Sequence, residues 1–164
     1  MADTQQSALP DREGPEGIGG WLVLPMLGLM LTPILGLVQL HNTDYLGMLQ
    51  NWQAFSLSQG VLILAELLIF GILNLSAPAL LLFFMFKRWQ IFPGWYMIWA
   101  FAMPVYAVLD PWAVHLAFST AVPELADAYD ADTVGGISRS IWAAVIWVPY
   151  MMRSERVANT FVNE

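Results

Sequence analysis

The sequence predicts an all-α, polytopic membrane protein with four transmembrane helices in a bundle and both termini in the cytoplasm. Three observations support this prediction: an apolar composition, four long stretches that are nearly free of charge, and a one-sided distribution of basic residues. Of the 164 residues, 58% are hydrophobic and only 12% are charged, and the mean hydropathy is positive. Water-soluble domains of this length are not so apolar.

Net charge and cysteine content exclude several functional classes. The chain carries 13 acidic and 6 basic residues, a formal net charge of -7, whereas a nucleic-acid-binding surface must be basic to neutralise phosphates. Cysteine is absent, which excludes disulfides, thiolate metal sites and a cysteine nucleophile. Only His41 and His115 remain as nitrogen ligands or imidazole bases.

Four stretches are long enough to span a bilayer, which requires roughly 20 mostly apolar residues. They cover residues 18–40, 61–86, 93–115 and 135–152. The segments outside them are an acidic and flexible N-terminal tail (1–17), two outer loops (41–60 and 116–134) and a short C-terminal tail (153–164). The acidic tail before the first stretch, with no small-residue cleavage site after it, favours a retained first helix over a cleaved signal peptide.

Basic residues set the predicted orientation, because lysine and arginine in short loops stay on the cytoplasmic side. Lys87, Arg88, Arg153 and Arg156 all fall on one side when four helices are threaded, and neither outer loop contains a lysine or an arginine. Both termini and these four residues are therefore predicted at the cytoplasmic interface. For the end of the C-terminal tail, residues 160–161, packing under the bundle and binding a partner both remain open.

The second outer loop and the two histidines suggest metal sites only weakly. The loop carries four carboxylates between residues 124 and 132, but they lack the glycine turn of a calcium loop. We therefore favour a solvated loop, with a short surface helix that begins near Pro123. His41 and His115 lie at the outer ends of the first and third helices, near Asp44 and Asp110. No tight ligand spacing supports a metal site there, so no metal and no cofactor is expected.

Ionisable residues inside the spans are the candidate functional positions, since a charge within the bilayer costs several kcal/mol unless it is paired or hydrated. Glu66, Asp110 and Arg139 all fall in the outer half of the predicted bundle. We predict that Glu66 pairs with Arg139 and that Asn74 hydrogen-bonds across the bundle. Such a cluster acts either as a fixed structural ion pair or as a site for a substrate, an ion or a proton.

Several motifs resemble a family. They are Gly19-Gly20-Trp21-Leu22 at the first helix, Glu66 and Asn74 in the second, Phe92-Pro93 before the third, Ser138-Arg139-Ser140 in the fourth, and Ile146-Trp147-Val148-Pro149-Tyr150 near the end. Together they resemble a small bacterial inner-membrane family of unknown function, domain-of-unknown-function family 2569. The resemblance extends from Gly17 to Val162. It implies a multi-pass protein of the bacterial inner membrane with four helices, and it implies no reaction, ligand or partner.

Two functions remain open. The first is a non-enzymatic accessory or interaction subunit that docks in a larger membrane assembly or forms a homo-oligomer within the lipid bilayer. The alternative is a small transporter or channel in which Glu66, Asn74, Asp110 and Arg139 line a polar outer-leaflet cavity. An enzyme is not expected, because the sequence contains no serine with a neighbouring base, no histidine-rich metal cluster and no phosphate-binding loop.

Overall fold

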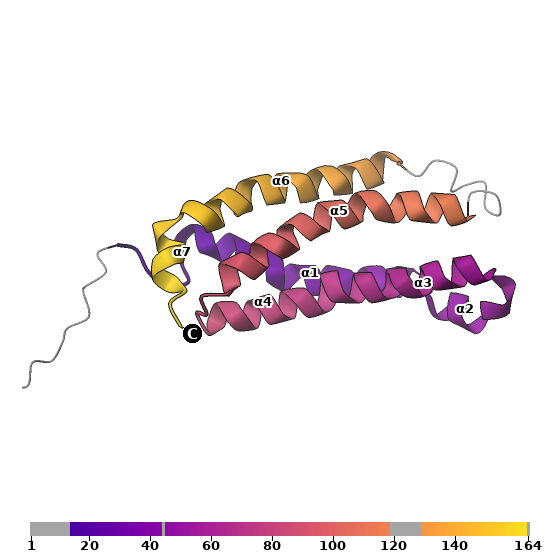
Figure 1. Cartoon of the computed structure of the whole chain (residues 1–164), viewed down its shortest axis with the longest axis horizontal. Coiled ribbons are helices and arrows are strands. Elements are labelled where there is room, and N and C mark those ends of the chain that lie inside the picture. The colour runs from indigo at the N-terminus through magenta and orange to yellow at the C-terminus, as the bar shows by residue number, and fades with distance from the viewer. Residues whose placement is uncertain (1–13, 44, 119–128, 164) are drawn as a thin grey trace, which may run out of the picture.

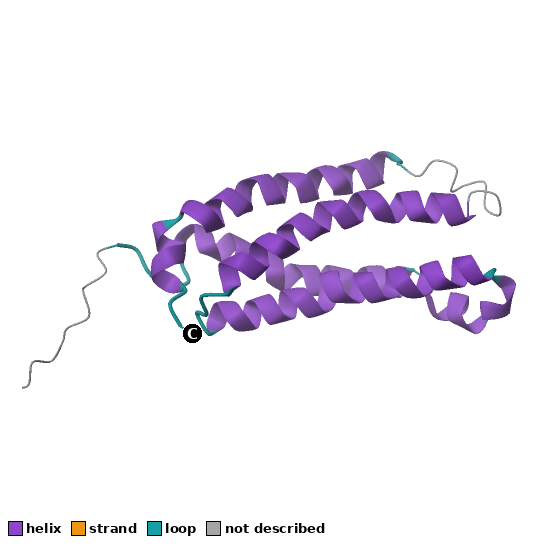
Figure 2. Cartoon of the chain, viewed as in Figure 1, coloured by secondary structure: helices purple, strands orange, loops and turns teal. Residues whose placement is uncertain are grey.

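A computed structural model describes residues 14–43, 45–118 and 129–163. Every regular element in these ranges is a helix (Figure 2). In chain order they are η1 (Gly20–Leu22), α1 (Val23–Asn42), α2 (Tyr45–Gln50), η2 (Trp52–Ala54), α3 (Leu57–Phe70), η3 (Gly71–Ser76), α4 (Ala77–Phe86), α5 (Phe92–Phe118), α6 (Ala131–Arg153) and α7 (Glu155–Thr160). The all-α prediction is therefore confirmed for the described part of the chain.

Three continuous helices have the length and hydropathy of a membrane span. They cover Gly20–Asn42, Leu57–Phe86 and Phe92–Phe118. The fourth long helix, α6, has 23 residues, which is about 34 Å at 1.5 Å per residue. The charged Arg139 and the small or polar residues around it make α6 less apolar than the other three. The chain is thus a polytopic membrane protein.

Capping side chains explain why two helices begin earlier than the sequence predicts. The second span begins at Leu57 rather than near 61, because Ser56 and Gln59 form a reciprocal capping box. The fourth helix begins at Ala131 rather than near 135, because the Asp130 carboxylate accepts a hydrogen bond from the Thr133 N–H at 2.8 Å. Hydropathy alone places the start of a helix at its first apolar residue, whereas these polar capping residues lie before that residue in the chain.

The long helices run side by side, and the first and last described residues lie at the same end of the bundle (Figure 1). We call this the terminal end and the opposite one the far end. Helix α6 packs along α5, α1 packs against α4 and η3, and α3 packs against α5. Lys87, Arg88, Arg153 and Arg156 belong to the loop and helix ends at the terminal end.

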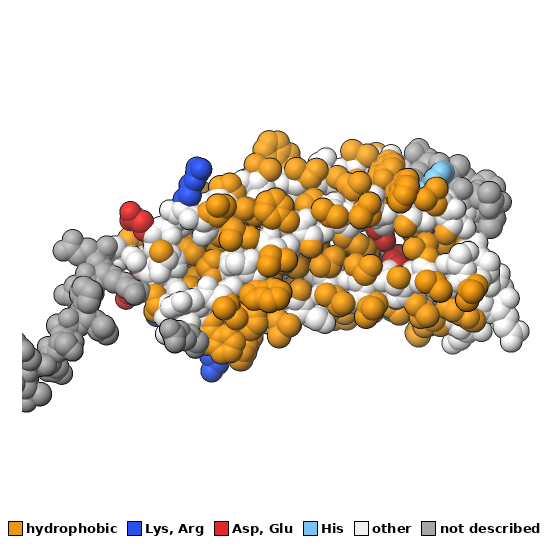
Figure 3. Space-filling view, viewed as in Figure 1, with side chains coloured by type: hydrophobic (Ala, Val, Ile, Leu, Met, Phe, Trp, Pro, Cys, Tyr) orange, Lys and Arg blue, Asp and Glu red, His pale blue; other side chains and the backbone are white. Residues whose placement is uncertain are grey.

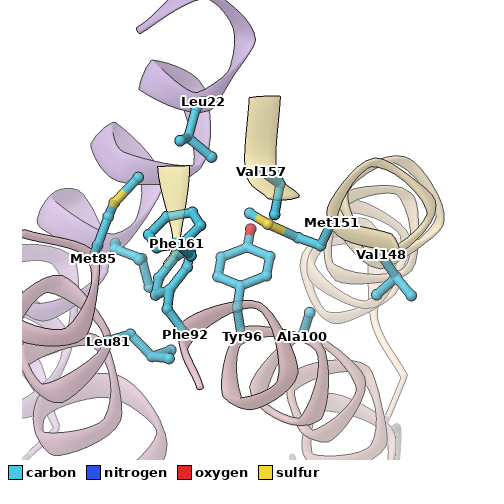
Figure 4. Close-up of a cluster of buried hydrophobic side chains, with 11 residues drawn as sticks. Leu22, Leu81, Met85, Phe92, Tyr96, Ala100, Val148, Met151, Val157 and Phe161 are labelled. Atoms are coloured by element: carbon cyan, nitrogen blue, oxygen red, sulfur yellow. The ribbon is translucent and has the colours of Figure 1, made fainter. Parts of the chain in front are cut away.

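A dense core fills the terminal end (Figure 4). The side chains of Leu22, Leu29, Met85 and Phe92 are 0% exposed. Phe161, which follows α7, stacks on Phe92 with ring centroids 4.5 Å apart. The segment predicted as a short C-terminal tail is therefore folded back under the bundle, which selects packing from the two roles that the sequence left open.

Hydrogen bonds hold both chain ends against this core. Asn163 bonds to the loop between α4 and α5, where its N–H donates to the Arg88 carbonyl at 3.0 Å and its carbonyl accepts from the Gln90 N–H at 2.9 Å. Arg156 donates to the Glu16 carbonyl at 3.1 Å. Helix α7 therefore contacts the residues just before the first helix, which belong to the tail predicted as flexible. Residues 1–13 of that tail lie outside the described ranges.

The sides of the bundle are apolar (Figure 3). Each long helix exposes large hydrophobic residues, for example Leu35 on α1, Leu68 on α3, Ile98 on α5 and Trp142 on α6. Apolar surface of this extent is stable in contact with lipid and unstable in water. Helix α6 therefore presents the same kind of surface as the three helices that meet the span criteria.

Candidate functional site: an acidic cleft between α3 and α5

Glu66 and Asp110 line one cleft between α3 and α5. The cleft has a volume of about 310 Å³, and its other lining residues are apolar apart from Tyr106. Acidic side-chain atoms are visible at the surface between apolar neighbours in the space-filling view (Figure 3). Two carboxylates in such surroundings repel each other, and a positive charge between them would stabilise both. The sequence named both residues, and the structure brings them together.

A tyrosine hydroxyl bonds to each carboxylate. The Tyr45 hydroxyl donates to Glu66 Oε1 at 2.8 Å, and the Tyr106 hydroxyl bonds to Asp110 one turn along α5. Tyr45 lies on α2, which folds back from the far end of α1 so that its ring is only 8% exposed. Burial, and then the charge of Glu66, raise the pKa of the Tyr45 phenol far above its usual value. It therefore remains a hydrogen-bond donor.

The far ends of α3 and α5 are joined above the cleft. The Gln59 amide, in the first turn of α3, donates to the Ala117 carbonyl in the last turn of α5 at 3.0 Å. Below this contact, Glu66 lies nine residues from the start of α3 and Asp110 eight from the end of α5. At 1.5 Å per residue, both lie about 12–14 Å from the far end. The carboxylates are therefore at the same level.

Arg139 lies at this level as well, eight residues from the start of α6, but it lines a different cavity. That cavity is bounded by α1, α5 and α6, and it contacts another face of α5 than the acidic cleft does. Glu66 has Tyr45 as its hydrogen-bond donor, and the structure does not bring it together with Arg139. The predicted Glu66–Arg139 pair is absent because α5 stands between the two side chains.

Asn74 belongs to neither cavity and makes a local bond. It lies in η3, a π-helical turn in the middle of the second span, and its amide donates to the Phe70 carbonyl at 3.3 Å. Pro78 has no N–H for the carbonyl four residues earlier, and a π-helical turn accommodates that loss. The neighbouring Leu73 carbonyl accepts from the Trp99 indole at 2.8 Å. A bond across the bundle therefore exists here, but Trp99 makes it.

His41 and His115 were only weak metal candidates in the sequence. Within residues 14–43, 45–118 and 129–163, no three His, Asp or Glu side chains lie close enough to hold a metal ion. His41 lines a separate cavity between α1 and α2. Asp44, its suggested neighbour, lies outside the described residues, as do the short surface helix expected near Pro123 and most of the acidic loop.

Neither Tyr45 nor Tyr106 was predicted from the sequence as a site residue. Tyr106 was detectable, because a hydroxyl four residues before Asp110 lies on the same helix face. Tyr45 had no such signal. It reaches Glu66 only because the six-residue helix α2 folds back toward α3, and neither hydropathy nor residue spacing predicts that arrangement.

The chain is similar to known proteins over most of its length. Residues 15–162 match the family model described as "Protein of unknown function (DUF2569)". Among curated proteins, the chain is similar to "Inner membrane protein YdgK" of Escherichia coli (strain K12), with 30% identity over 155 residues that cover 91% of this chain and 96% of the relative. No solved structure is significantly similar to the chain.

Proposed function

The chain belongs to the DUF2569 family of proteins of unknown function, and its relative YdgK is an inner membrane protein; we propose that it is a non-enzymatic accessory subunit of the bacterial inner membrane. Its acidic cleft docks a membrane partner that carries a positive charge. The proposed topology has four transmembrane helices and cytoplasmic termini.

The observation that carries the proposal is the pair of carboxylates in one cleft. Glu66 and Asp110 line the cleft between α3 and α5, and no lysine or arginine from the described ranges lines it with them. A lysine or arginine on a partner helix would complete the site, since intramembrane charges pair with one another. The apolar walls would meanwhile pack against that helix.

The dense terminal end favours docking over conduction. A channel or transporter needs a polar path across the bilayer, whereas the core at the terminal end holds residues with no exposed surface, among them Leu29 and Met85. The acidic cleft ends near the middle of the bundle, at Leu73 and Ala102. This contrast makes the transporter alternative the weaker of the two.

The four-helix topology rests on three supports. Helix α6 lies alongside α5, exposes apolar side chains as the other spans do, and returns the chain to the end where it began (Figure 1). An even number of crossings places both termini on one side. The cluster of basic residues at that end supports a cytoplasmic location.

Site-specific photo-crosslinking in native membranes tests the docking proposal. A photoreactive residue at Val105, which lines the cleft and is 57% exposed, is compared with one at Leu80, which is 55% exposed and lies outside it. We expect an adduct from position 105 only, mapped to a partner helix beside a lysine or arginine. The double variant Glu66→Gln/Asp110→Asn should reduce it at least tenfold, while the matched control Asp132→Asn/Glu155→Gln should not.

The opposite result is equally concrete. In that result, no adduct forms at either position and the protein purifies as a monomer. Proteoliposomes that contain it take up a small cation, and Glu66→Gln abolishes the uptake. The accessory role would then be wrong, and the transporter alternative would replace it.

A further inference from the structure

A second groove lies on the other side of α5, between α1 and α6. Its volume is about 330 Å³. Helix α1 packs against α4 and α6 against α5, so residues without large side chains, such as Gly28, Gly136 and Ala143, leave a gap between α1 and α6. A Cβ atom added at Gly28 would meet nothing within 4 Å. The groove is therefore open space within the bundle.

Arg139 lies at the far end of this groove. Its guanidinium is turned toward the start of α6, where Nη1 lies 3.6 Å from the Cβ position of Gly135 and Nη2 lies 3.8 Å from that of Gly136. This is the snorkelling direction expected of an arginine in the outer half of a bilayer. The part of the chain that the structure describes supplies no carboxylate to this side chain. Its positive charge is thus available to an anion from outside the chain.

We propose that this groove binds an anionic phospholipid of the outer leaflet, with the phosphate on Arg139 and one acyl chain between α1 and α6. A planar guanidinium binds phosphate through two parallel hydrogen bonds. Its level, about 12 Å or less from the far end of α6, is that of the lipid headgroups and upper acyl chains.

The dimensions of the groove fit an acyl chain. Along α6 the lining runs from Gly136 to Trp147, eleven residues or about 16 Å. One leaflet of a hydrocarbon core about 30 Å thick measures about 15 Å, so an acyl chain that extends from a phosphate at Arg139 reaches past the middle of α6 toward Trp147. A volume of 330 Å³ over that length gives a cross-section of about 20 Å². A helix at least about 10 Å wide needs roughly four times as much, so a partner helix could lie over the groove, as proposed for the acidic cleft, but could not fill it.

Native mass spectrometry of the purified full chain tests the proposal, with phosphatidylglycerol titrated into mild detergent. We expect one phosphatidylglycerol to remain bound to the wild type after loosely bound lipids have been stripped. Arg139→Gln should weaken that binding about tenfold or more, whereas Arg153→Gln, which removes the same charge at the other end of α6, should leave it unchanged. Arg139→Lys should retain part of it.

The groove itself is tested by adding volume. Gly28→Leu should weaken binding as Arg139→Gln does, while Gly94→Leu, which adds the same side chain at another position with no atom within 4 Å, should not. Equal lipid retention by Arg139→Gln and Arg153→Gln would overturn the proposal. Displacement of the lipid by inorganic phosphate at equal concentration would also overturn it, because the occupant would then be a free anion. A dimer that Arg139→Gln dissociates would overturn it as well, because the occupant would then be a second copy of the chain.

Discussion

Replacing Phe161 by alanine should destabilise the whole bundle, although this residue is only three positions before Glu164. Phe161 is 5% exposed and stacks on Phe92, itself 0% exposed, with centroids 4.5 Å apart and an interplanar angle of 29°. Truncation of a buried phenylalanine costs about 3–5 kcal/mol. Of this, about 0.5–1.5 kcal/mol belongs to the aromatic pair.

The assay is thermal unfolding in detergent, with Phe86→Ala as the matched control. Phe86 ends α4 at the same end of the bundle but is 57% exposed, so its truncation leaves the core intact. For a domain of this size, 3 kcal/mol corresponds to a fall in Tm of about 6–12 °C. A double-mutant cycle of Phe92→Ala with Phe161→Ala should return a coupling of about 1 kcal/mol. If Phe161→Ala lowers Tm no more than Phe86→Ala does, α7 is not part of the folded core and our reasoning fails.

Two further predictions concern the far end. Gly60→Ala should lower the free energy of unfolding by about 1–3 kcal/mol, because the new Cβ would lie 2.5 Å from the Trp52 ring. Gly94→Ala is the control, and equal Tm values for the two variants would show that this clash does not occur. The hydrogen bond from Thr133 lowers the pKa of Asp130, so its contribution to stability is full above the unfolded pKa of about 3.9 and is lost as pH falls through the folded value. The Tm advantage of wild type over Asp130→Ala should therefore shrink below about pH 4, and an advantage that stays constant down to pH 3 would contradict the cap.

The sequence predicted what depends on composition and local chemistry. Three spans and a fourth long helix follow from apolar stretches such as 93–115, and the level of Glu66, Asp110 and Arg139 follows from counting residues along helices. Which face each residue occupies in the assembled bundle was not predictable. Glu66 and Arg139 lie at one level, but pairing them also requires α3 and α6 to be neighbours, and neighbours are decided by packing over the whole length of each helix.

The separation of opposite charges by α5 connects the two proposed sites. Ala102 and Tyr106 face the acidic cleft, whereas Trp99 and Met103 face the groove of Arg139. The two cavities share no lining residue on α5, so α5 keeps Glu66 and the Arg139 guanidinium from neutralising each other. Had they paired, the bundle would have gained a buried ion pair, which contributes little to stability on balance. Kept apart, each charge can be stabilised further by a group of opposite sign from outside the chain. This is the common basis of both proposals, a cationic partner at the acidic cleft and an anionic lipid at the groove of Arg139.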